Sequence, residues 1–280
     1  MRDRHRALDR AGCATMAVVN ADPRPAAPAD ELLALASRVA RAAGDELRRR
    51  HGRAGRVDAK SSATDPVSDA DRASEELLVG EILQARPDDG IVGEEGGDRA
   101  GTSELRWLLD PLDGTVNFLY GFPSWCVSVA CEDDEGTVVG VVYDPSHDEL
   151  FSARRGAGAH LDGEPLAVND PVALEQALIA TGFSYDRQHR RQQAEVVARV
   201  LAQVRDIRRA GAAALDLCWL AAGRVDGYYE DSTSRWDWAA GALIASEAGA
   251  TVTELPGPGD GSGVVAAGPA LHDALRDLVT

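Results

Sequence analysis

The order of the predicted secondary-structure elements changes near the middle of the chain, and this change restricts the fold more than any other feature. Two helical patterns are followed by a run of antiparallel strand signals, after which strands and helices alternate to the C-terminus. Strands joined by hairpins form a meander, whereas alternating strands and helices are typical of α/β units. We therefore expect an N-terminal α+β lobe over residues 29–169 and a C-terminal α/β lobe over residues 170–280.

The boundaries of the first elements follow from capping residues and apolar spacing. Asp30 and Ser68 each precede an apolar stripe of helical period, and Gly52 and Pro87 mark the ends of these two helices. Further along, Gly136 lies at the turn between two strand-like runs, which predicts a β-hairpin.

Composition limits the classes of partner. The chain of 280 residues has 29 lysine and arginine residues against 46 aspartate and glutamate residues, a net charge of -17. This balance argues against nucleic acid or an anionic membrane as the main partner. It is compatible with a site that collects divalent cations, and also with an acidic excess that serves only solubility.

The cysteines indicate a reducing compartment. The four are Cys13, Cys126, Cys131 and Cys218, and none forms a C-x-x-C pair or has a histidine at ligand spacing, which argues against structural zinc. Cys126 and Cys131 lie five residues apart in a predicted strand, so they point to opposite faces and cannot pair with each other. We expect reduced thiols in a cytoplasmic protein.

The N-terminal residues carry no sign of a folded element. Residues 1–28 contain a Pro/Ala-rich stretch, and we expect them to form a disordered arm, with Met16 as an alternative start of translation. The first residues lack the apolar run of a signal peptide, and no run in the chain reaches membrane-spanning length.

The stretch RWLLDPLDGTVNF, residues 106–118, contains the most informative chemistry. Trp107 to Leu109 read as a short buried strand, which Pro111 should end because it has no N–H to donate. Asp110 and Asp113 then crowd one strand end. The pattern is compatible with a solvated Asp-rich turn, or with a site in which two repelling carboxylates share a cation.

Three other acidic groups also lie at element ends. Asp71 falls in the first turn of the second predicted helix, where capping would also explain it. Glu94 follows a strand in the loop VGEEGG. Asp237 lies between two tryptophans, so we expect it to be buried and either paired with Arg235 or bound to a metal.

The convergence of carboxylates at strand ends favours metal-assisted phosphoryl chemistry. Oxygen ligands without cysteine or histidine select hard cations such as Mg²⁺ or Mn²⁺. Gly114 followed by Thr115 suggests backbone N–H groups that suit a phosphate. The chain has neither a nucleotide P-loop nor a G-x-S-x-G elbow, and the six histidines are predicted to be surface residues away from these clusters.

Three motifs in order resemble the inositol monophosphatase family of Mg²⁺-dependent, lithium-sensitive phosphatases. They are GEE at 93–95, LDPLDGTVNF at 109–118 and WDWAAG at 236–241, and the resemblance extends from about Asp30 to the C-terminus. It implies a layered αβαβα sandwich, with one mainly antiparallel sheet in each of two lobes and the active site between the lobes.

The resemblance also implies roles for single residues. The implied metal ligands are Glu94, Asp110, the carbonyl of Leu112, Asp113 and Asp237. The implied catalytic pair that orients the attacking water is Asp71 and Thr115. The implied substrate contacts are Gly114 and Thr115 for phosphate and Glu230 for inositol hydroxyls, with Lys60 near the mouth of the site. Ala212 stands where the family often has serine or threonine, which removes a hydroxyl near the substrate.

The function implied is hydrolysis of inositol-1-phosphate by a cytoplasmic homodimer with Mg²⁺, or Mn²⁺ as a substitute. Alternatives of the same fold are phosphatases for histidinol phosphate, fructose bisphosphate or adenosine bisphosphate. A non-enzymatic alternative is a regulatory binding protein of the transcription machinery. In each enzymatic case the partner is a small phosphorylated molecule, with neither nucleic acid nor membrane.

Overall fold

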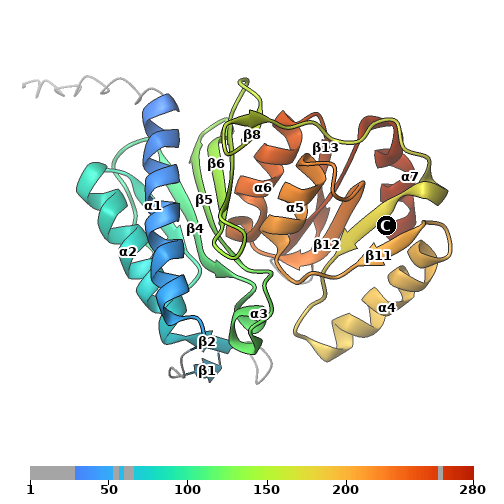
Figure 1. Ribbon diagram of the computed structural model, residues 1–280, viewed down its shortest axis with the longest axis horizontal. Coiled ribbons are helices and arrows are strands. Elements are labelled where there is room, and N and C mark those ends of the chain that lie inside the picture. Colours follow the sequence, from blue (N-terminus) through green and yellow to red (C-terminus); the bar gives the residue numbers. More distant parts are fainter. Residues whose placement is uncertain (1–28, 53–56, 60–65, 258–260) are drawn as a thin grey trace, which may run out of the picture.

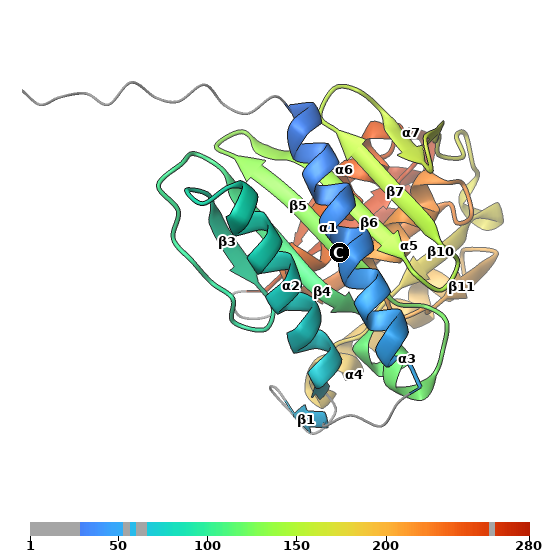
Figure 2. The same cartoon turned by 60° about the vertical axis from the view of Figure 1, so that its left-hand side comes forward.

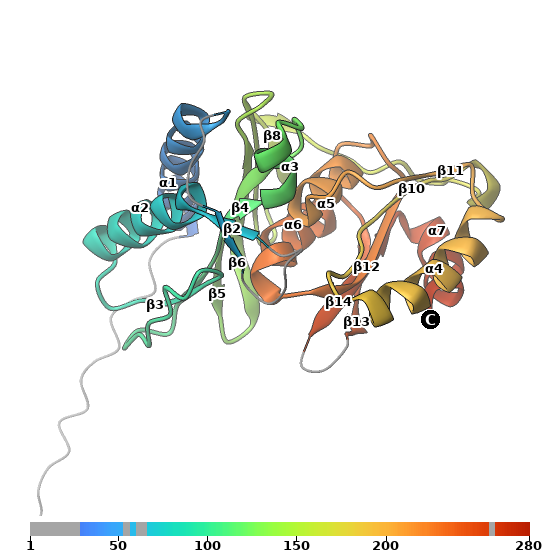
Figure 3. The same ribbon diagram turned by 90° about the horizontal axis from the view of Figure 1, so that it is seen from below.

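Five layers of helix and sheet alternate through the molecule, as Figure 1 and Figure 3 show. The layered αβαβα arrangement expected from the sequence is thus confirmed. The computed structural model describes residues 29–52, 57–59, 66–257 and 261–280. The predicted N-terminal arm with Met16, and Lys60, lie outside the described residues.

The first layer consists of α1 (Ala29–Arg50) and α2 (Asp69–Ala85), which lie side by side on one face of the first sheet (Figure 2). The predicted cap of α2 is confirmed, because the side chain of Ser68 accepts the N–H of Ala70. Acidic residues in the first turn of each helix complement the helix dipole.

The first sheet has seven strands in sequence order, of which the first two pair in parallel and the others are antiparallel. Its strands are β3 (Gly90–Gly93), β4 (Arg106–Asp113), β5 (Cys126–Asp133), β6 (Gly136–Asp144), β7 (Glu149–Arg154), β8 (Ala159–Leu161) and β9 (Glu164–Pro165). A separate antiparallel pair, β1 (Val57–Ala59) and β2 (Pro66–Ser68), precedes α2. The one-turn helix α3 (Thr115–Tyr120) follows β4.

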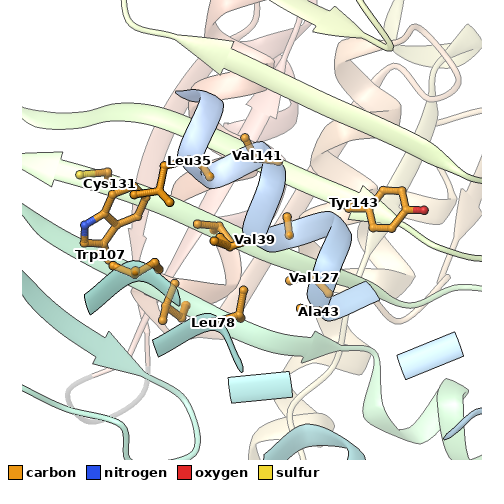
Figure 4. Close-up of a cluster of buried hydrophobic side chains, with 14 of the residues drawn as sticks. Leu35, Val39, Ala43, Leu78, Trp107, Val127, Cys131, Val141 and Tyr143 are labelled. Atoms are coloured by element: carbon orange, nitrogen blue, oxygen red, sulfur yellow. The ribbon is translucent and has the colours of Figure 1, made fainter. Parts of the chain in front are cut away.

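The core between the helices and this sheet is built from aliphatic and aromatic side chains (Figure 4). Its members include Leu35, Val39 and Ala43 of α1, Leu78 of α2, and Trp107, Val127, Cys131, Val141 and Tyr143 of the sheet. Cys131 belongs to this core, whereas Cys126 packs with the residues of α5 and α6 on the opposite face. The prediction that these two thiols face opposite ways is confirmed.

The middle layer is the helix pair α5 (Ala213–Ala221) and α6 (Arg235–Glu247), which contacts both sheets. The second sheet has the order β11-β10-β12-β14-β13, and α4 and α7 cover its outer face. Its elements are β10 (Leu178–Thr181), α4 (Arg187–Leu201), β11 (Asp206–Arg208), β12 (Gly227–Thr233), β13 (Thr251–Pro256), β14 (Ser262–Ala267) and α7 (Pro269–Val279).

Two details of the expected sheets were wrong. The second sheet is mixed rather than mainly antiparallel, because β10 pairs in parallel with both β11 and β12. Strand β4 does not end at Pro111 but continues to Asp113, with a shift in its register against β5. Among the described helices, none has the length and apolar character needed to cross a membrane.

Candidate active site

The end of β4 brings two aspartates to the same side of the sheet through a β-bulge. Asp110 lies opposite Ser128 and Asp113 opposite Cys126, so β4 has one more residue than β5 between these pairs. Residues three apart in a regular strand point to opposite faces, and the extra residue cancels that alternation. The N–H of Leu112 donates to Oδ1 of Asp110 at 3.0 Å, which stabilises the bulge.

A glycine turns the chain directly after the bulge. Gly114 has φ 88°, and a Cβ at this position would lie 2.8 Å from the carbonyl oxygen of Ser124. Both the left-handed backbone and the lack of space therefore require glycine. The turn starts α3 with Thr115, whose Oγ1 lies 2.9 Å from Oδ1 of Asp71 and 3.1 Å from the carbonyl of Leu112.

Asp71 is fully buried and connects α2 with α3. Its Oδ2 accepts the N–H of Ser68 at 2.9 Å, while its Oδ1 accepts the hydroxyl of Thr115. The capping role considered from the sequence is therefore real, and it coexists with the contact to Thr115.

Asp237 lies in the first turn of α6 and faces the same region as the bulge. Its Oδ2 accepts the N–H of Ser234 at 2.7 Å. The guanidinium of Arg235 instead pairs with Glu132, through Nε at 2.9 Å, and with Glu254 at 3.2 Å. The ion pair between Arg235 and Asp237 that the sequence left open is thus not the arrangement found.

These elements surround one cavity between the two sheets. The predicted residues that line it are Glu94, Asp110, Leu112, Asp113, Gly114, Thr115, Glu230 and Asp237. Asp71 lies behind Thr115. Ala212 is buried in the core beside the cavity, and its neighbours Gly211 and Ala213 supply the lining there.

The carboxylates of the cavity raise one another's pKa values. Burial raises the pKa of Asp110 well above its ordinary value, and the charges of Glu94, Asp113 and Asp237 add to this rise. Burial also raises the pKa of Asp113 to about 6, against the effect of the Ala214 N–H, which donates to its Oδ2 at 2.8 Å. The pKa of Asp237 is raised well above its usual range by burial, and next by the charge of Glu94. Positive charge in the cavity would stabilise all three ionised aspartates.

The donor chemistry fits a hard divalent cation. Four carboxylates and the carbonyl of Leu112 line the cavity, and such oxygen ligands are those that Mg²⁺ and Mn²⁺ prefer. In the part of the chain that the structure describes, no three histidine, cysteine, aspartate or glutamate side chains are already arranged to hold a metal ion.

The opposite wall of the cavity contains Glu230 at the middle of β12. Its Oε2 accepts the hydroxyl of Tyr228 at 2.9 Å, and burial raises its pKa to about 7. A Cβ on Gly182 would lie 1.9 Å from the same oxygen, so this glycine makes room for the carboxylate.

Sequence reasoning missed several lining residues. They are Gly182, Phe183, Ser184, Tyr185, Arg209, Ser232 and Thr233. Gly182 reaches the cavity because β10 pairs in parallel with β12. This pairing sets Thr181 beside Tyr229, and so Gly182 beside Glu230. That pairing could not be read from the local sequence. Arg209 is exposed, and its guanidinium lies 6.0 Å from the ring centroid of Phe183.

Comparisons with known proteins agree with this architecture. The model of the inositol monophosphatase family matches residues 29–279. The inositol-1-monophosphatase SuhB of Mycobacterium tuberculosis is 47% identical over 232 residues, covering 79% of this chain and 80% of that protein. The Nus factor SuhB of Vibrio cholerae is 41% identical over 232 residues, covering 82% and 87%.

A solved structure gives the same result at the level of the fold. The crystal structure of the extragenic suppressor protein suhB from Bartonella henselae superposes with a TM-score of 0.83 at 38% identity, covering 89% of this chain and 98% of that one. Because the family model matches residues 29–279, a range that contains every helix and strand of the described residues, the chain belongs to the inositol monophosphatase family.

Proposed function

We propose that this protein is a Mg²⁺-dependent phosphomonoesterase that hydrolyses inositol-1-phosphate to inositol and phosphate, with Mn²⁺ as a substitute metal. One observation carries the proposal. Glu94, the pair Asp110 and Asp113 of β4, and Asp237 of α6 come from three separate segments of the chain and line the same cavity. Four repelling carboxylates gathered around one cavity are the mark of a functional site.

The metal would be held by Glu94, Asp110, the carbonyl of Leu112, Asp113 and Asp237. Bound there, a divalent ion supplies positive charge to the phosphate oxygens and to the attacking water. The protein itself fixes the ligands, since the bulge directs Asp110 and Asp113 to one side and the first turn of α6 orients Asp237.

Asp71 and Thr115 would orient the attacking water. The hydroxyl of Thr115 donates to Oδ1 of Asp71, which leaves the oxygen of Thr115 able to accept a hydrogen bond from water. Asp71 is rigid because Ser68 holds its other oxygen. The N–H groups of Gly114 and Thr115 are assigned to the phosphate oxygens.

Glu230 would accept hydrogen bonds from the hydroxyls of the alcohol portion. Ala212 contributes no hydroxyl. For Lys60, a role near the mouth of the site is proposed from the family resemblance alone. The exposed guanidinium of Arg209 on the same wall would favour a neutral or anionic polyol over the cationic amine of histidinol phosphate. This is the physical reason for preferring inositol phosphate over histidinol phosphate.

A phosphate-release panel tests the proposal. The substrates are inositol-1-phosphate, histidinol phosphate, fructose-1,6-bisphosphate and adenosine bisphosphate, each with Mg²⁺, with Mn²⁺ and with a chelator. We expect inositol-1-phosphate to be turned over fastest and the chelator to abolish activity. Inactivity on all four with either metal would overturn the proposal and leave the regulatory alternative, to which the name of the Vibrio cholerae relative points.

We also propose that the protein is a cytoplasmic homodimer with no nucleic-acid or membrane partner. The three cysteines of the described residues are free thiols, in keeping with a reducing compartment. Tyr120 and Phe122, which are 87% and 57% exposed, lie two positions apart, and Phe122 lines a groove together with Trp219. Exposed apolar clusters of this kind mark interfaces.

Light scattering tests the dimer. The wild-type protein should have twice the chain mass, and the double variant Tyr120→Ser with Phe122→Ser should shift toward the monomer. Leu201→Ser is the matched control, because this leucine is 52% exposed but isolated on α4. A monomeric wild-type protein, or equal effects of both changes, would contradict the proposed interface.

A further inference from the structure

One face of α2 contacts three pieces of the candidate active site. Asp71 accepts the hydroxyl of Thr115 at the start of α3. One turn later, Ser74 donates its hydroxyl to the carbonyl of Pro111 in the bulge, at 2.8 Å. Its neighbour Glu75 has no part in the proposed chemistry, although it is only 7% exposed.

Glu75 holds the loop that carries Glu94. Its Oε1 accepts the N–H of Glu95 at 3.1 Å and the N–H of Gly97 at 3.3 Å. The two amides belong to the residues on either side of Gly96, so a single carboxylate oxygen holds both sides of the loop. The backbone N–H of Glu94 donates to the carbonyl of Leu109 at 3.2 Å.

Glycines make this contact possible. A Cβ on Gly93 would lie 2.0 Å from Oε1 of Glu75, and one on Gly97 would lie 3.1 Å from it. Gly93 and Gly97, the first and last residues of GEEGG, therefore leave the space that the carboxylate of Glu75 occupies. Because neither has a φ in the left-handed region, it is this close approach and not the backbone conformation that requires glycine.

The carboxylate is kept there against an electrostatic cost. Burial raises the pKa of Glu75, the two amides lower it, and the charges of Glu94 and Asp98 raise it again. An apolar residue would avoid that cost but could not accept the two N–H groups.

We propose that Glu75 is a positioning residue, which fixes the 94–97 loop through two backbone amides so that the carboxylate of Glu94 faces the metal cavity. The inference rests on the proposed function only in assigning Glu94 to the metal. Residues that orient a metal ligand in this way typically change metal affinity or activity by about 10–100-fold when they are replaced.

The first test compares Glu75→Ala, Glu75→Gln and the control Glu76→Ala, whose glutamate is the exposed neighbour on the same helix. Glu75→Ala should raise the Mg²⁺ concentration for half-maximal phosphate release by about 10-fold or more, with little change in the KM for substrate. Glu75→Gln keeps one oxygen that accepts both amides, so it should restore most of the loss. Glu76→Ala should behave as the wild type.

The second test needs neither metal nor substrate. In the metal-free protein, hydrogen exchange of the amides of Glu95 and Gly97 should be faster in Glu75→Ala than in Glu76→Ala. If the wild-type protein released no phosphate but this difference in exchange were present, the proposed function would fail and the positioning role would stand. The response to metal would then be measured as the rise in melting temperature that Mg²⁺ causes.

The third test approaches the same contact from the loop. Gly93→Ala places a methyl group against Oε1 of Glu75 and should reproduce the weaker Mg²⁺ response, even if Glu75→Ala failed to fold. Gly80→Ala on the same helix α2 is its control, because a Cβ there meets nothing within 4 Å. Unchanged Mg²⁺ dependence and unchanged exchange in folded Glu75→Ala would overturn the inference, as would equal effects of Glu75→Ala and Glu75→Gln.

Discussion

Asp71 shows that one carboxylate can cap a helix and hold a residue of the candidate active site at the same time. Its two oxygens are divided between Ser68 at the cap of α2 and the hydroxyl of Thr115. Sequence reasoning treated capping and catalysis as competing explanations, but the two oxygens of a carboxylate allow both. Asp237 repeats the pattern, since it completes the capping box of α6 with Ser234 and lines the cavity.

The first prediction concerns Asp110. Asp110→Asn should lower kcat by more than about a hundredfold, because a neutral amide is a far weaker ligand for Mg²⁺ than a carboxylate. The fold should persist, since the amide oxygen can still accept the N–H of Leu112. The metal-free variant should melt no lower than the wild type, because one of the repelling charges is gone.

Phosphate release and thermal melting check both statements. The exposed Asp134→Asn in the β5–β6 hairpin is the control and should leave both unchanged. Near wild-type turnover by folded Asp110→Asn in Mg²⁺ would exclude a ligand role for this residue.

The second prediction uses the pKa of Glu230 to separate substrate recognition from metal chemistry. With a pKa of about 7, Glu230 is mostly protonated at pH 6 and mostly ionised at pH 8. The ratio of kcat/KM for inositol-1-phosphate to that for p-nitrophenyl phosphate should therefore rise between these pH values. The proposed metal ligands act on both substrates, so the effect of their titration cancels in the ratio.

Glu230→Gln should make that ratio independent of pH. It should also lower kcat/KM for inositol-1-phosphate at pH 8 by roughly ten- to a hundredfold, as for loss of a hydrogen bond to a charged group worth about 1.5–3 kcal/mol. Equal losses on both substrates would mean that Glu230 supports the metal ligands or the fold instead.

Among the elements, strand β4 shows where local rules gave the wrong answer. Proline cannot donate to a ladder, which predicted that the strand ends at Pro111. At a bulge, however, the extra residue has no ladder partner, so the missing N–H costs nothing. The apolar stripes of α1 and α2 and the cap of α2 were predicted well, because these are local signals. The predicted cap of α1 was wrong, since this helix begins at Ala29 and Asp30 lies in its first turn.

The third prediction concerns the strand and helix ends that carry the cavity carboxylates. The folded-state pKa of Asp113 is raised from its usual 3.8 to about 6, so its protonation favours the folded state. That contribution is fully present below about pH 4 and is lost as the pH rises through 6. Asp110 and Asp237, with pKa values raised well above normal, extend the loss to higher pH.

The metal-free protein should therefore melt at progressively lower temperature from pH 5 to pH 8. Carboxylates whose pKa is lowered by arginine, such as Asp133 and Glu46, are ionised throughout this range, so they do not contribute to the change of melting temperature with pH. Added Mg²⁺ should raise the melting temperature more at pH 8 than at pH 5, because protons compete with it for the same oxygens. A melting temperature that rises with pH in the chelator would contradict this account.

At the scale of the whole molecule, the number and kind of layers followed from element order and from the family resemblance, and the hairpin of β5 and β6 followed from the local turn signal at Gly136. The pairing of strands far apart in the chain did not. Which strand lies beside β10 depends on residues far apart in the chain, so the mixed second sheet was not foreseen. The same dependence on long-range pairing explains which residues of the cavity could be predicted. Carboxylates at strand ends were found from local motifs, whereas Gly182 and Arg209 reach the cavity only through this long-range arrangement.

The two sheets share the cavity because α6 lies very close to the first of them. A Cβ on Gly140 of β6 would lie 2.8 Å from the carbonyl oxygen of Ala240 and 2.9 Å from its Cα. Backbone therefore meets backbone at this point, three residues along α6 from Asp237. A methyl group at Gly140 would therefore meet the backbone of α6 close to Asp237.

The fourth prediction follows from that contact. Gly140→Ala should force α6 away from the sheet at an overpacking cost of about 1–3 kcal/mol, and so lower the melting temperature by several degrees. Because Asp237 moves with α6, the Mg²⁺ concentration for half-maximal activity should rise as well. Gly80→Ala, where the added methyl meets nothing, should leave the Mg²⁺ dependence unchanged and melt at the same or a slightly higher temperature. Lower stability of Gly140→Ala with normal Mg²⁺ dependence would mean that this contact holds the two halves together without setting the geometry of the site.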